Sequence, residues 1–326
     1  MQFQDFQGQS QHIERLRREF AAHSFSHAYL FTGPAGTGKR SVARLAAAAA
    51  LCRGEDKPCG VCGPCRRVAA GTHPDVHELL PETGKRDIGV AVVRAALSEV
   101  SVRAFEDGAK VFLVPQADRL SPQAQNALLK TLEEPPDGTV FILCTDKPSA
   151  LLPTVASRLR IIRFHPLSQE AATQRLMQLG VPQARASALA ALTGGLIGPA
   201  LAMDEGAIDA RKQLQSRIFS IRRVSDIPAV AAQYKDEKLD RQAFLDSLEG
   251  IVRDLLAARA SGVPLSPELC DAAALAYGAA VPLQGMLSLM EKVQEARRMM
   301  GSYVSFAALL ERILLEMTEE YKRWPW

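Results

Sequence analysis

A glycine-rich loop between an apolar run and a helix-prone segment most constrains what this chain can fold into. The letters GPAGTGKRS occupy residues 33–41, after the apolar residues 28–31 and before the alanine-rich residues 42–51. This order predicts a buried strand, a phosphate-binding loop and a helix, with loop N–H groups and the helix N-terminus facing an anion. The loop residues expected at a nucleotide are Gly33, Gly36, Thr37, Gly38, Lys39, Arg40 and Ser41.

The residue after the loop lysine departs from the usual pattern. Lys39 is placed to reach terminal phosphates, but the next position, where Ser or Thr holds Mg²⁺ in a working loop, is Arg40. Ser41 is one residue late, and one step along a helix turns a side chain by about 100°. We therefore predict descent from a nucleotide loop rather than a generic glycine-rich turn. Whether the loop still binds nucleotide stays open.

A second departure follows the apolar run at residues 110–114. P-loop ATPases end this strand with an acidic residue that supports Mg²⁺, often followed by a glutamate that polarises the attacking water. Here the chain continues as Pro115 and Gln116, neither of which is an acid. Asp118 comes three residues after Pro115 and is expected to lie in a turn.

Five apolar runs that alternate with helix-like segments predict a doubly wound parallel sheet. Thr145 follows the fourth run. A polar residue there inspects a γ-phosphate in many ATPases or makes only local hydrogen bonds, and the sequence does not choose. The predicted strands are residues 28–31, 76–80, 110–114, 140–144 and 161–164.

A helix is predicted over residues 123–134. Ser121 is its expected N-cap, and Pro122 lies in the first turn, where its missing N–H has no cost. The face expected to pack consists of Ala127, Leu128, Thr131 and Leu132.

Four cysteines with the spacing C-x6-C-x2-C-x2-C follow the alanine-rich helix predicted after the glycine-rich loop. Four thiolates at this density suit a closed, structural zinc site, with free buried cysteines or an iron–sulfur cluster as alternatives. We interpret His73 and His77 as a turn residue and a satisfied polar side chain rather than ligands. Cys144 and Cys270 stand alone and are expected to be buried. The predicted ligands are Cys52, Cys59, Cys62 and Cys65.

Composition limits the remaining classes of function. A chain of 326 residues exceeds one core of usual size and suggests two or three domains. Its 39 basic and 36 acidic residues leave a net charge of +3, too small to indicate a nucleic-acid binder. The polar N-terminus and the lack of any run of about 18 apolar residues favour a cytoplasmic protein without a membrane partner. Beyond residue 208, apolar residues recur three and four apart, which is typical of a helical bundle.

Taken together, these motifs resemble the bacterial clamp loaders, which are AAA+ proteins of the DNA polymerase III holoenzyme. The resemblance covers the first domain by motif and the rest by size and helical character. It implies an α/β AAA+ P-loop-type module over residues 1–166 with a zinc insert at 52–65, a helical lid over 167–206 and an all-α collar over 207–326. The motifs are HAYLF at 27–31, the four cysteines, AGTHPD at 70–75, NALLKTLEEPP at 126–136 and SR at 157–158.

The departures indicate which type of subunit the chain resembles. The motor subunits gamma and tau have Ser or Thr at the position of Arg40, an acidic pair at Pro115 and Gln116, and an arginine in the segment matched by residues 194–201. This chain has none of the three. The resemblance therefore implies a non-hydrolysing, stator-like accessory subunit. Its implied partners are gamma/tau and delta in a hetero-oligomeric ring, with the sliding clamp and primer-template DNA contacted through the complex.

The resemblance places the chemistry on Arg158. Ser157 and Arg158 match the family's Ser-Arg-Cys motif, with Leu159 in third place. In that family this arginine reaches the γ-phosphate bound by the neighbouring subunit. The chain is thus expected to supply an arginine finger in trans and no catalytic residue in cis, a surface ion pair being the alternative for Arg158. For the whole chain, the alternatives are an active gamma/tau-like ATPase and a zinc-dependent nucleic-acid-binding module.

Overall fold

The chain folds into two compact units, an α/β unit and a helical unit. One consists of Met1–Ala171 with Leu196–Gly198, and the other of Ala172–Gly195 with Pro199–Trp326. The predicted division of the helical part into a lid and a collar at residues 206 and 207 stays a prediction. The computed structural model describes residues 3, 10–22, 24–106, 109–203, 206–219, 221, 223–234, 241–300 and 305–323.

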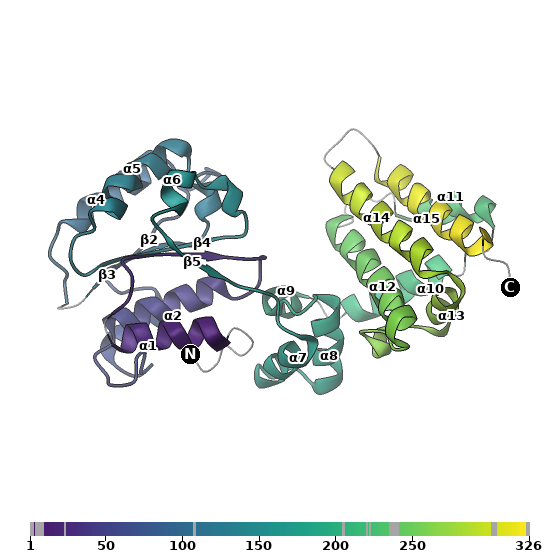
Figure 1. The fold of residues 1–326 in the computed structure, drawn as a ribbon, viewed down its shortest axis with the longest axis horizontal. Helices are drawn as coiled ribbons and strands as arrows, with labels where there is room; N and C mark the ends of the chain where they lie inside the picture. The colour runs from purple at the N-terminus through teal and green to yellow at the C-terminus, as the bar shows by residue number, and fades with distance from the viewer. Residues whose placement is uncertain are drawn as a thin grey trace. The chain divides into compact units, whose positions relative to one another are not determined.

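A five-stranded parallel sheet forms the centre of the α/β unit, as the sequence predicts (Figure 1). The strand order is β2-β3-β4-β1-β5, so β1, which precedes the glycine-rich loop, lies between β4 and β5. Because all pairs are parallel, the carboxyl ends of the strands meet at one edge. The strands are β1 (Ala28–Thr32), β2 (Val76–Glu78), β3 (Lys110–Val114), β4 (Thr139–Thr145) and β5 (Arg160–Arg163).

Helices cover both faces of this sheet (Figure 1). The helices α1 (Ser10–Ala21) and α2 (Lys39–Leu51) lie on one face, and α4 (Val90–Val100), α5 (Pro122–Glu133) and α6 (Pro153–Ala156) lie on the other. Two apolar clusters result, and alternate residues of β1 enter different ones: Tyr29 and Phe31 pack with α1 and α2, while Ala28 and Leu30 pack with α4 and α5. Burial on both sides explains why the strands read as continuous apolar runs.

Most predicted boundaries of the strands and of α5 hold within one residue. Strand β2 is the exception, since it ends at Glu78 rather than at residue 80. The predicted cap of α5 is confirmed, because the Ser121 hydroxyl accepts a hydrogen bond from the Ala124 N–H at 3.2 Å.

The packed face of α5 was predicted only in part. Leu128 and Leu132 are buried, but Ala127 and Thr131 are half-buried, and Ala124 and Gln125 complete the buried face. Gln125 is tolerated inside because its amide group donates to two backbone carbonyls and accepts from a third backbone group. The partners are Leu120 O and Ala150 O at 3.1 Å and the Leu152 N–H at 2.7 Å.

The helical unit is built around apolar residues that recur three and four apart on α12 and α15, in the spacing predicted beyond residue 208. All of them belong to one buried cluster: Phe244, Leu248, Ile251, Val252 and Leu255 on α12, and Phe306, Leu309, Leu310, Ile313 and Leu314 on α15. The helices from residue 169 onward are α7 (Gln169–Gln178), α8 (Gln183–Leu192), α9 (Ile197–Ala202), α10 (Ala207–Phe219), α11 (Ile227–Ala232), α12 (Arg241–Ser261), α13 (Ala272–Ala280), α14 (Leu283–Met299) and α15 (Phe306–Arg323).

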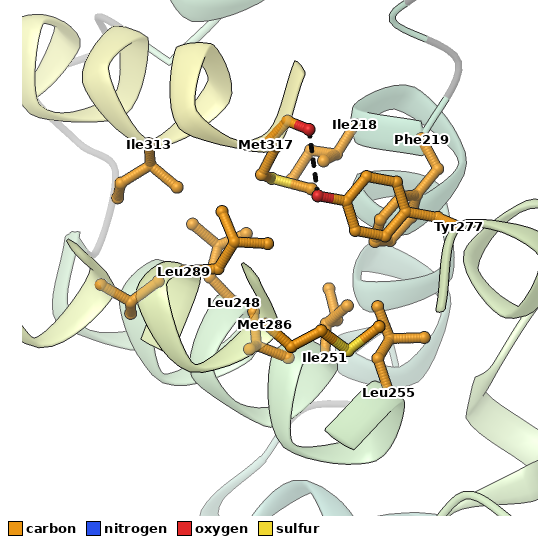
Figure 2. Close-up of a pocket in the computed structure, with 12 residues that line it drawn as sticks. Ile218, Phe219, Leu248, Ile251, Leu255, Tyr277, Met286, Leu289, Ile313 and Met317 are labelled. Carbon is orange, nitrogen blue, oxygen red and sulfur yellow. Dashed lines mark hydrogen bonds between the residues drawn. The ribbon is translucent and has the colours of Figure 1, made fainter. Parts of the chain in front are cut away.

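A small pocket inside this bundle is lined by apolar side chains from α10, α12, α13, α14 and α15 (Figure 2). The Tyr277 hydroxyl donates to the Met317 carbonyl oxygen at 3.0 Å and so has its hydrogen bond satisfied. The sequence leaves open whether Tyr321, Trp324 and Trp326 cover the bundle or a partner. Tyr321 stacks on Tyr277 with ring centroids 5.7 Å apart. Trp324 and Trp326 lie outside the described residues. The pocket is therefore a packing feature of the core.

Within the described residues, no helix taken singly has the length and apolar character to cross a membrane; α13 and α14, bent by 115° at the break between them, satisfy that test only as a pair.

Candidate functional site

The glycine-rich loop closes on its own lysine. Lys39 Nζ donates to the carbonyl oxygens of Gly33 at 2.6 Å and Pro34 at 2.7 Å. Only 8% of Lys39 is exposed, and burial lowers the pKa of its ammonium group. The Thr37 hydroxyl donates to the same Pro34 oxygen at 2.9 Å. The ammonium group of Lys39 is thus hydrogen-bonded to backbone oxygens of its own loop.

Glycine is required in this loop by the fold, whatever the loop binds. Gly36 and Gly38 have φ angles of 82° and 86°, in the left-handed region that favours glycine. At Gly33, with φ 141°, a Cβ atom would lie 2.2 Å from the Phe164 carbonyl oxygen, which follows β5. The close approach of two backbone segments therefore accounts for Gly33 without a ligand.

Arg40 connects the start of α2 to the end of β3. Its side chain is exposed, and its Nε donates to the Pro115 carbonyl oxygen at 3.1 Å. The two positions that depart from the P-loop pattern in the sequence are therefore in contact in the structure. Sequence reasoning noted each departure but missed the contact, because the residues are 75 positions apart. Ser41 lies one residue further along α2 and is half-buried.

Thr145 at the end of β4 makes local hydrogen bonds. Its Oγ1 donates to Asp118 Oδ1 at 3.3 Å and accepts from the Lys147 N–H at 2.9 Å. Thr145 is buried, and Asp118 lies in the short 3-10 turn Ala117–Arg119 where a turn was predicted. Local hydrogen bonding, one of the two roles left open for Thr145, is thus observed, and the role at a γ-phosphate stays a prediction.

Gly198, in the segment 194–201 that the resemblance matches to an arginine-bearing segment of the motor subunits, lies against the loop. The Gly198 N–H donates to the Gly36 carbonyl oxygen at 3.3 Å, and a Cβ atom at Gly198 would lie 3.1 Å from Gly36 Cα. Its neighbours Ile197 and Pro199 carry no charge. Gly198, rather than a charged side chain, thus contacts the loop in this segment.

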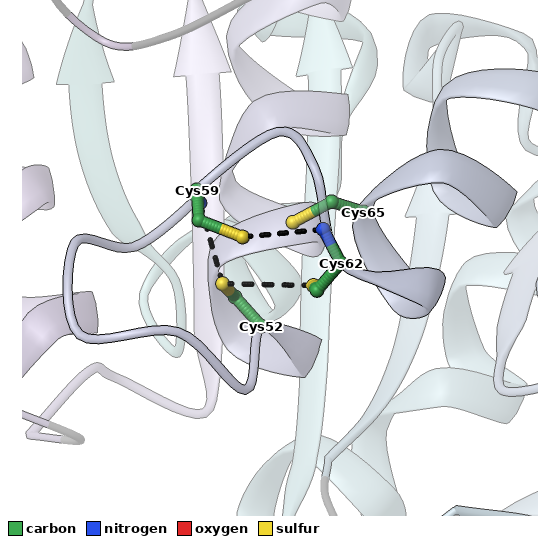
Figure 3. Close-up of side chains that lie close together, drawn as sticks. All are labelled: Cys52, Cys59, Cys62 and Cys65. Atoms are coloured by element: carbon green, nitrogen blue, oxygen red, sulfur yellow. Dashed lines mark hydrogen bonds between the residues drawn. The ribbon is translucent and has the colours of Figure 1, made fainter.

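The four predicted metal ligands come together in the structure (Figure 3). Their sulfur atoms all lie within 4.8 Å of one another, and the Cys52 and Cys62 Sγ atoms are 3.9 Å apart. Zinc–sulfur bonds of about 2.3 Å in a tetrahedron place the sulfurs roughly 3.8 Å apart. Cys52 follows the end of α2, and Cys65 lies in α3 (Gly63–Ala70). The cluster can thus hold a metal ion such as zinc.

Backbone N–H groups donate to two of these sulfurs. The Gly54 and Cys59 N–H groups each donate to Cys52 Sγ at 3.3 Å, and the Cys62 N–H donates to Cys59 Sγ at 3.4 Å. Hydrogen bonds from the backbone of Val61 and Cys62 lower the pKa of Cys59 to about 6, whereas burial raises the pKa of Cys52. N–H groups that donate to sulfur also stabilise and orient a thiolate that is bound to a metal ion.

Other residues considered as ligands lie apart from this cluster. His73 is buried, its Nδ1 accepts from the Asp75 N–H at 3.1 Å, and burial lowers its pKa. His77 stacks on Phe112 with ring centroids 4.9 Å apart. Cys144 is buried as predicted, but Cys270 is only half-buried, so that prediction was wrong for Cys270.

Arg158 lies just before β5, at the surface. Its Nη1 donates to the Thr154 carbonyl oxygen at 2.6 Å, and its Nη2 donates to Glu133 Oε1. The side chain remains 33% exposed. The Ser157 hydroxyl donates to the same Thr154 oxygen at 3.2 Å. Arg158 therefore forms a surface ion pair with Glu133 of the NALLKTLEEPP segment, and about a third of its side chain stays exposed.

The sheet order, the glycine-rich loop after β1 and the helical C-terminal region define an α/β AAA+ P-loop-type protein. Residues 8–168 match the family described as "DNA polymerase III, delta subunit". A DNA polymerase III subunit delta' from Bacillus subtilis is 30% identical over 305 residues, which cover 90% of this chain and 91% of that protein. The chain belongs to the DNA polymerase III subunit delta' family, within the bacterial clamp loaders that the sequence motifs indicate.

Two further relatives show how the likeness is distributed. The subunit delta' of Pseudomonas aeruginosa is 42% identical over 175 residues, which span 52% of this chain and 53% of that protein. The subunit tau of Bacillus subtilis is 31% identical over 336 residues, which cover 99% of this chain and 58% of that protein. The likeness thus extends to both subunit types whose motifs the sequence shares.

Proposed function

We propose that this chain is a non-hydrolysing, stator-like subunit of the DNA polymerase III clamp loader. In this role it supplies Arg158 in trans to the ATPase site of a neighbouring gamma/tau subunit. It works in the cytoplasm, in a hetero-oligomeric ring with gamma/tau and delta, and takes part in loading the sliding clamp onto primer-template DNA. Its own loop is a remnant of a nucleotide site that does not turn over ATP.

The contact between Arg40 and Pro115 is the main support for the proposed lack of ATP hydrolysis. A working site needs a hydroxyl and a carboxylate that together hold Mg²⁺ near the phosphates. Here the guanidinium of Arg40 extends to the Pro115 carbonyl oxygen at 3.1 Å. The positive charge of Arg40 therefore lies where the residues at positions 40 and 115 would have to hold Mg²⁺. Electrostatic repulsion and the missing ligands both oppose Mg²⁺ there.

Two further features support the same proposal. Lys39 spends its donors on Gly33 and Pro34, so reaching a phosphate means breaking two charge-assisted hydrogen bonds. Gly198, in place of a sensor arginine, supplies no charge to neutralise a transferring phosphoryl group. The site thus lacks a hydroxyl directly after the loop lysine, an acidic residue at positions 115 and 116, and a sensor cation.

The position of Arg158 supports a role at a neighbouring subunit. Its planar guanidinium offers five N–H donors, and the structure engages Nη1 with Thr154 and Nη2 with Glu133. The exposed remainder of the group can approach a phosphate that another chain binds. Such an arginine stabilises the charge that develops on the transferring phosphoryl group, which matters in the transition state more than in the ground state.

We assign zinc as the ion of the cysteine cluster, with Cys52, Cys59, Cys62 and Cys65 as ligands. Four thiolates leave no position for water, so the ion supplies structural stability rather than catalysis. The insert is short and rich in turns, and metal binding would supply most of its folding free energy, on the order of 10 kcal/mol.

The proposal is tested by measuring DNA-stimulated ATP turnover of the complex reconstituted with gamma/tau, delta, the clamp and primer-template DNA. We expect Arg158→Ala to slow turnover by about 10²-fold or more, with the variant chain still folded and incorporated. Arg163→Ala is the matched control, because Arg163 is an exposed arginine at the end of the adjoining strand β5.

Two outcomes would contradict the assignment. Turnover unchanged by Arg158→Ala in a fully assembled complex removes the role in trans. An equal loss with Arg163→Ala shows that the loss reflects general surface charge rather than a specific contact. Assembly is checked independently by size-exclusion chromatography of each complex.

A further inference from the structure

Glu106 connects the two ends of the cysteine insert to a surface loop. Arg53 follows Cys52 directly, and Arg67 lies two residues after Cys65. Arg53 Nη2 lies 3.1 Å from Glu106 Oε2, and Arg67 Nη2 donates to Glu106 Oε1. The carboxylate side chain is only 16% exposed. One largely buried carboxylate therefore joins the residues that adjoin the first and the last of the four ligands.

The backbone of the same loop is held by Asp75. Its two carboxylate oxygens accept from the Phe105 N–H at 2.8 Å and the Glu106 N–H at 3.0 Å. The Asp75 N–H in turn donates to His73 Nδ1, and His73 Nε2 lies 4.0 Å from Glu106 Oε2 with no hydrogen-bond partner of its own. The His73 side chain is fully buried. The loop is thus fastened to one continuous polar network that reaches the insert.

A bound metal ion would fix the insert at Cys52 and Cys65, close in the chain to the two arginines that pair with Glu106. Four thiolates around Zn²⁺ carry a net negative charge that four thiols do not, and the ion fixes the positions of all four ligands. Arg53 and Arg67, which adjoin the ligands, are then held near fixed points of the backbone. Ordering these two arginines lowers the entropy cost of pairing them with Glu106.

We propose that the metal site and the loop of residues 101–106 are coupled through Glu106, so that metal binding stabilises the loop in the arrangement seen. This loop carries two exposed apolar side chains, Val102 at 53% and Phe105 at 79% exposure. The metal therefore governs how this surface is presented, in addition to stabilising the insert. The coupling does not depend on the role of Arg158.

Coupling between two sites is reciprocal. If the metal makes the loop arrangement more favourable by some factor, the loop contacts must tighten metal binding by the same factor. Removal of the Glu106 carboxylate is therefore expected to affect both the loop and the affinity for the ion. If the ion pairs of Glu106 are purely local, removal of its carboxylate changes neither the order of the loop nor the affinity for the metal ion.

The test compares zinc-loaded and chelator-treated full-length chains by hydrogen exchange at the Phe105 and Glu106 amides. In the wild type we expect chelation to speed this exchange about fivefold or more. In Glu106→Gln the two amides exchange rapidly with or without zinc, and competition against a chelator shows zinc affinity reduced by a similar factor. Glu78→Gln is the matched control, because Glu78 pairs with Arg44 at 2.9 Å away from the cysteines; it should behave as the wild type.

The proposal is overturned if chelation leaves exchange at residues 105–106 unchanged while the insert itself loses protection, or if Glu106→Gln binds zinc as tightly as the wild type. The Phe141 amide, which donates to the His27 carbonyl oxygen inside the sheet, reports whether chelation unfolds the whole unit. If chelation does unfold the whole unit, the proposal is tested by the zinc affinity alone, measured on the folded, zinc-loaded variants. If Glu106→Gln does not fold, Arg53→Gln replaces it, since Arg53 is 63% exposed, and the same two readouts must move in the same direction.

Discussion

Lys39 and Arg158 are both cations of the kind that phosphoryl transfer uses, but their surroundings are opposite. Lys39 is 8% exposed and donates to two carbonyl oxygens of its own loop. Arg158 is 33% exposed and sits at the surface before β5. The loop lysine is buried and bound by its own loop, whereas the arginine pairs with Glu133 at the surface and stays partly exposed. The proposed function assigns no turnover to the loop of Lys39 and a role in trans to Arg158, and separate elements of the fold carry these two cations.

The largest expected effect separates charge from geometry at Arg158. A lysine keeps the positive charge but lacks the planar fork that binds phosphate and carboxylate through two parallel hydrogen bonds. We expect Arg158→Lys to slow ATP turnover of the reconstituted complex nearly as much as Arg158→Ala, by about 10²-fold. Full activity of the lysine variant would show that charge alone suffices, and would weaken the contrast with Lys39.

A smaller effect is expected at Lys39, and on stability rather than on turnover. Lys39→Ala leaves the Gly33 and Pro34 carbonyl oxygens without their ammonium donor, which should lower the free energy of unfolding by about 1.5–3 kcal/mol. Lys39→Met keeps the packed side-chain stem and should cost less. Urea denaturation measures both. If Lys39→Ala also slowed ATP turnover of the complex, the loop would contribute to catalysis, which contradicts the purely structural role given to Lys39 here.

The strand that follows Arg158 is anchored by an ion pair that acid should weaken. Arg160 donates to both oxygens of Glu19, at 2.8 and 2.6 Å, and the Tyr29 hydroxyl donates to the same carboxylate at 3.1 Å. Burial acts to raise the pKa of Glu19, but these hydrogen bonds and that from Arg15 outweigh it and hold the pKa below its ordinary value of 4.5.

A folded-state pKa below the unfolded one means that the stabilisation is fully present above pH 4.5 and is lost as the pH falls through the lower, folded value. Glu19→Gln should therefore lower the free energy of unfolding at neutral pH by on the order of 1 kcal/mol. Denaturation curves of the two proteins should converge under strongly acidic conditions. A difference that stays constant with pH would mean that the charge of Glu19 contributes nothing.

The smallest effect is expected where the sequence first departs from a working loop. Arg40→Ser restores the hydroxyl but not the carboxylate that Pro115 and Gln116 lack, so the isolated chain should show no ATP turnover above background, like the wild type. Because Arg40 is exposed, we expect stability to change by about 0.5 kcal/mol or less. Turnover that appeared in Arg40→Ser and vanished with Lys39→Ala would mean that the chain is close to an active ATPase.

Much of the α/β unit could be predicted from local patterns. Strands buried on both faces must be apolar throughout, so the runs that became β1, β3 and β4 stand out from their polar neighbours. Ser121 followed by Pro122 marked the start of α5, since capping is settled by a few adjacent residues. Gln125 was missed, because a buried glutamine depends on backbone partners at Ala150 and Leu152, which no local pattern reveals.

By itself the sequence determined the order of strands and helices, the family, the four cysteines and the residues missing from the nucleotide loop, because each of these is written in residue type and short spacing. Only the tertiary structure decided what the remaining cations do. The contact of Arg40 with Pro115, the pairing of Arg158 with Glu133 and the convergence of Arg53 and Arg67 on Glu106 join residues distant in the chain. Hydrogen bonds and ion pairs act over a few ångströms, so their partners are set by how the chain folds back on itself.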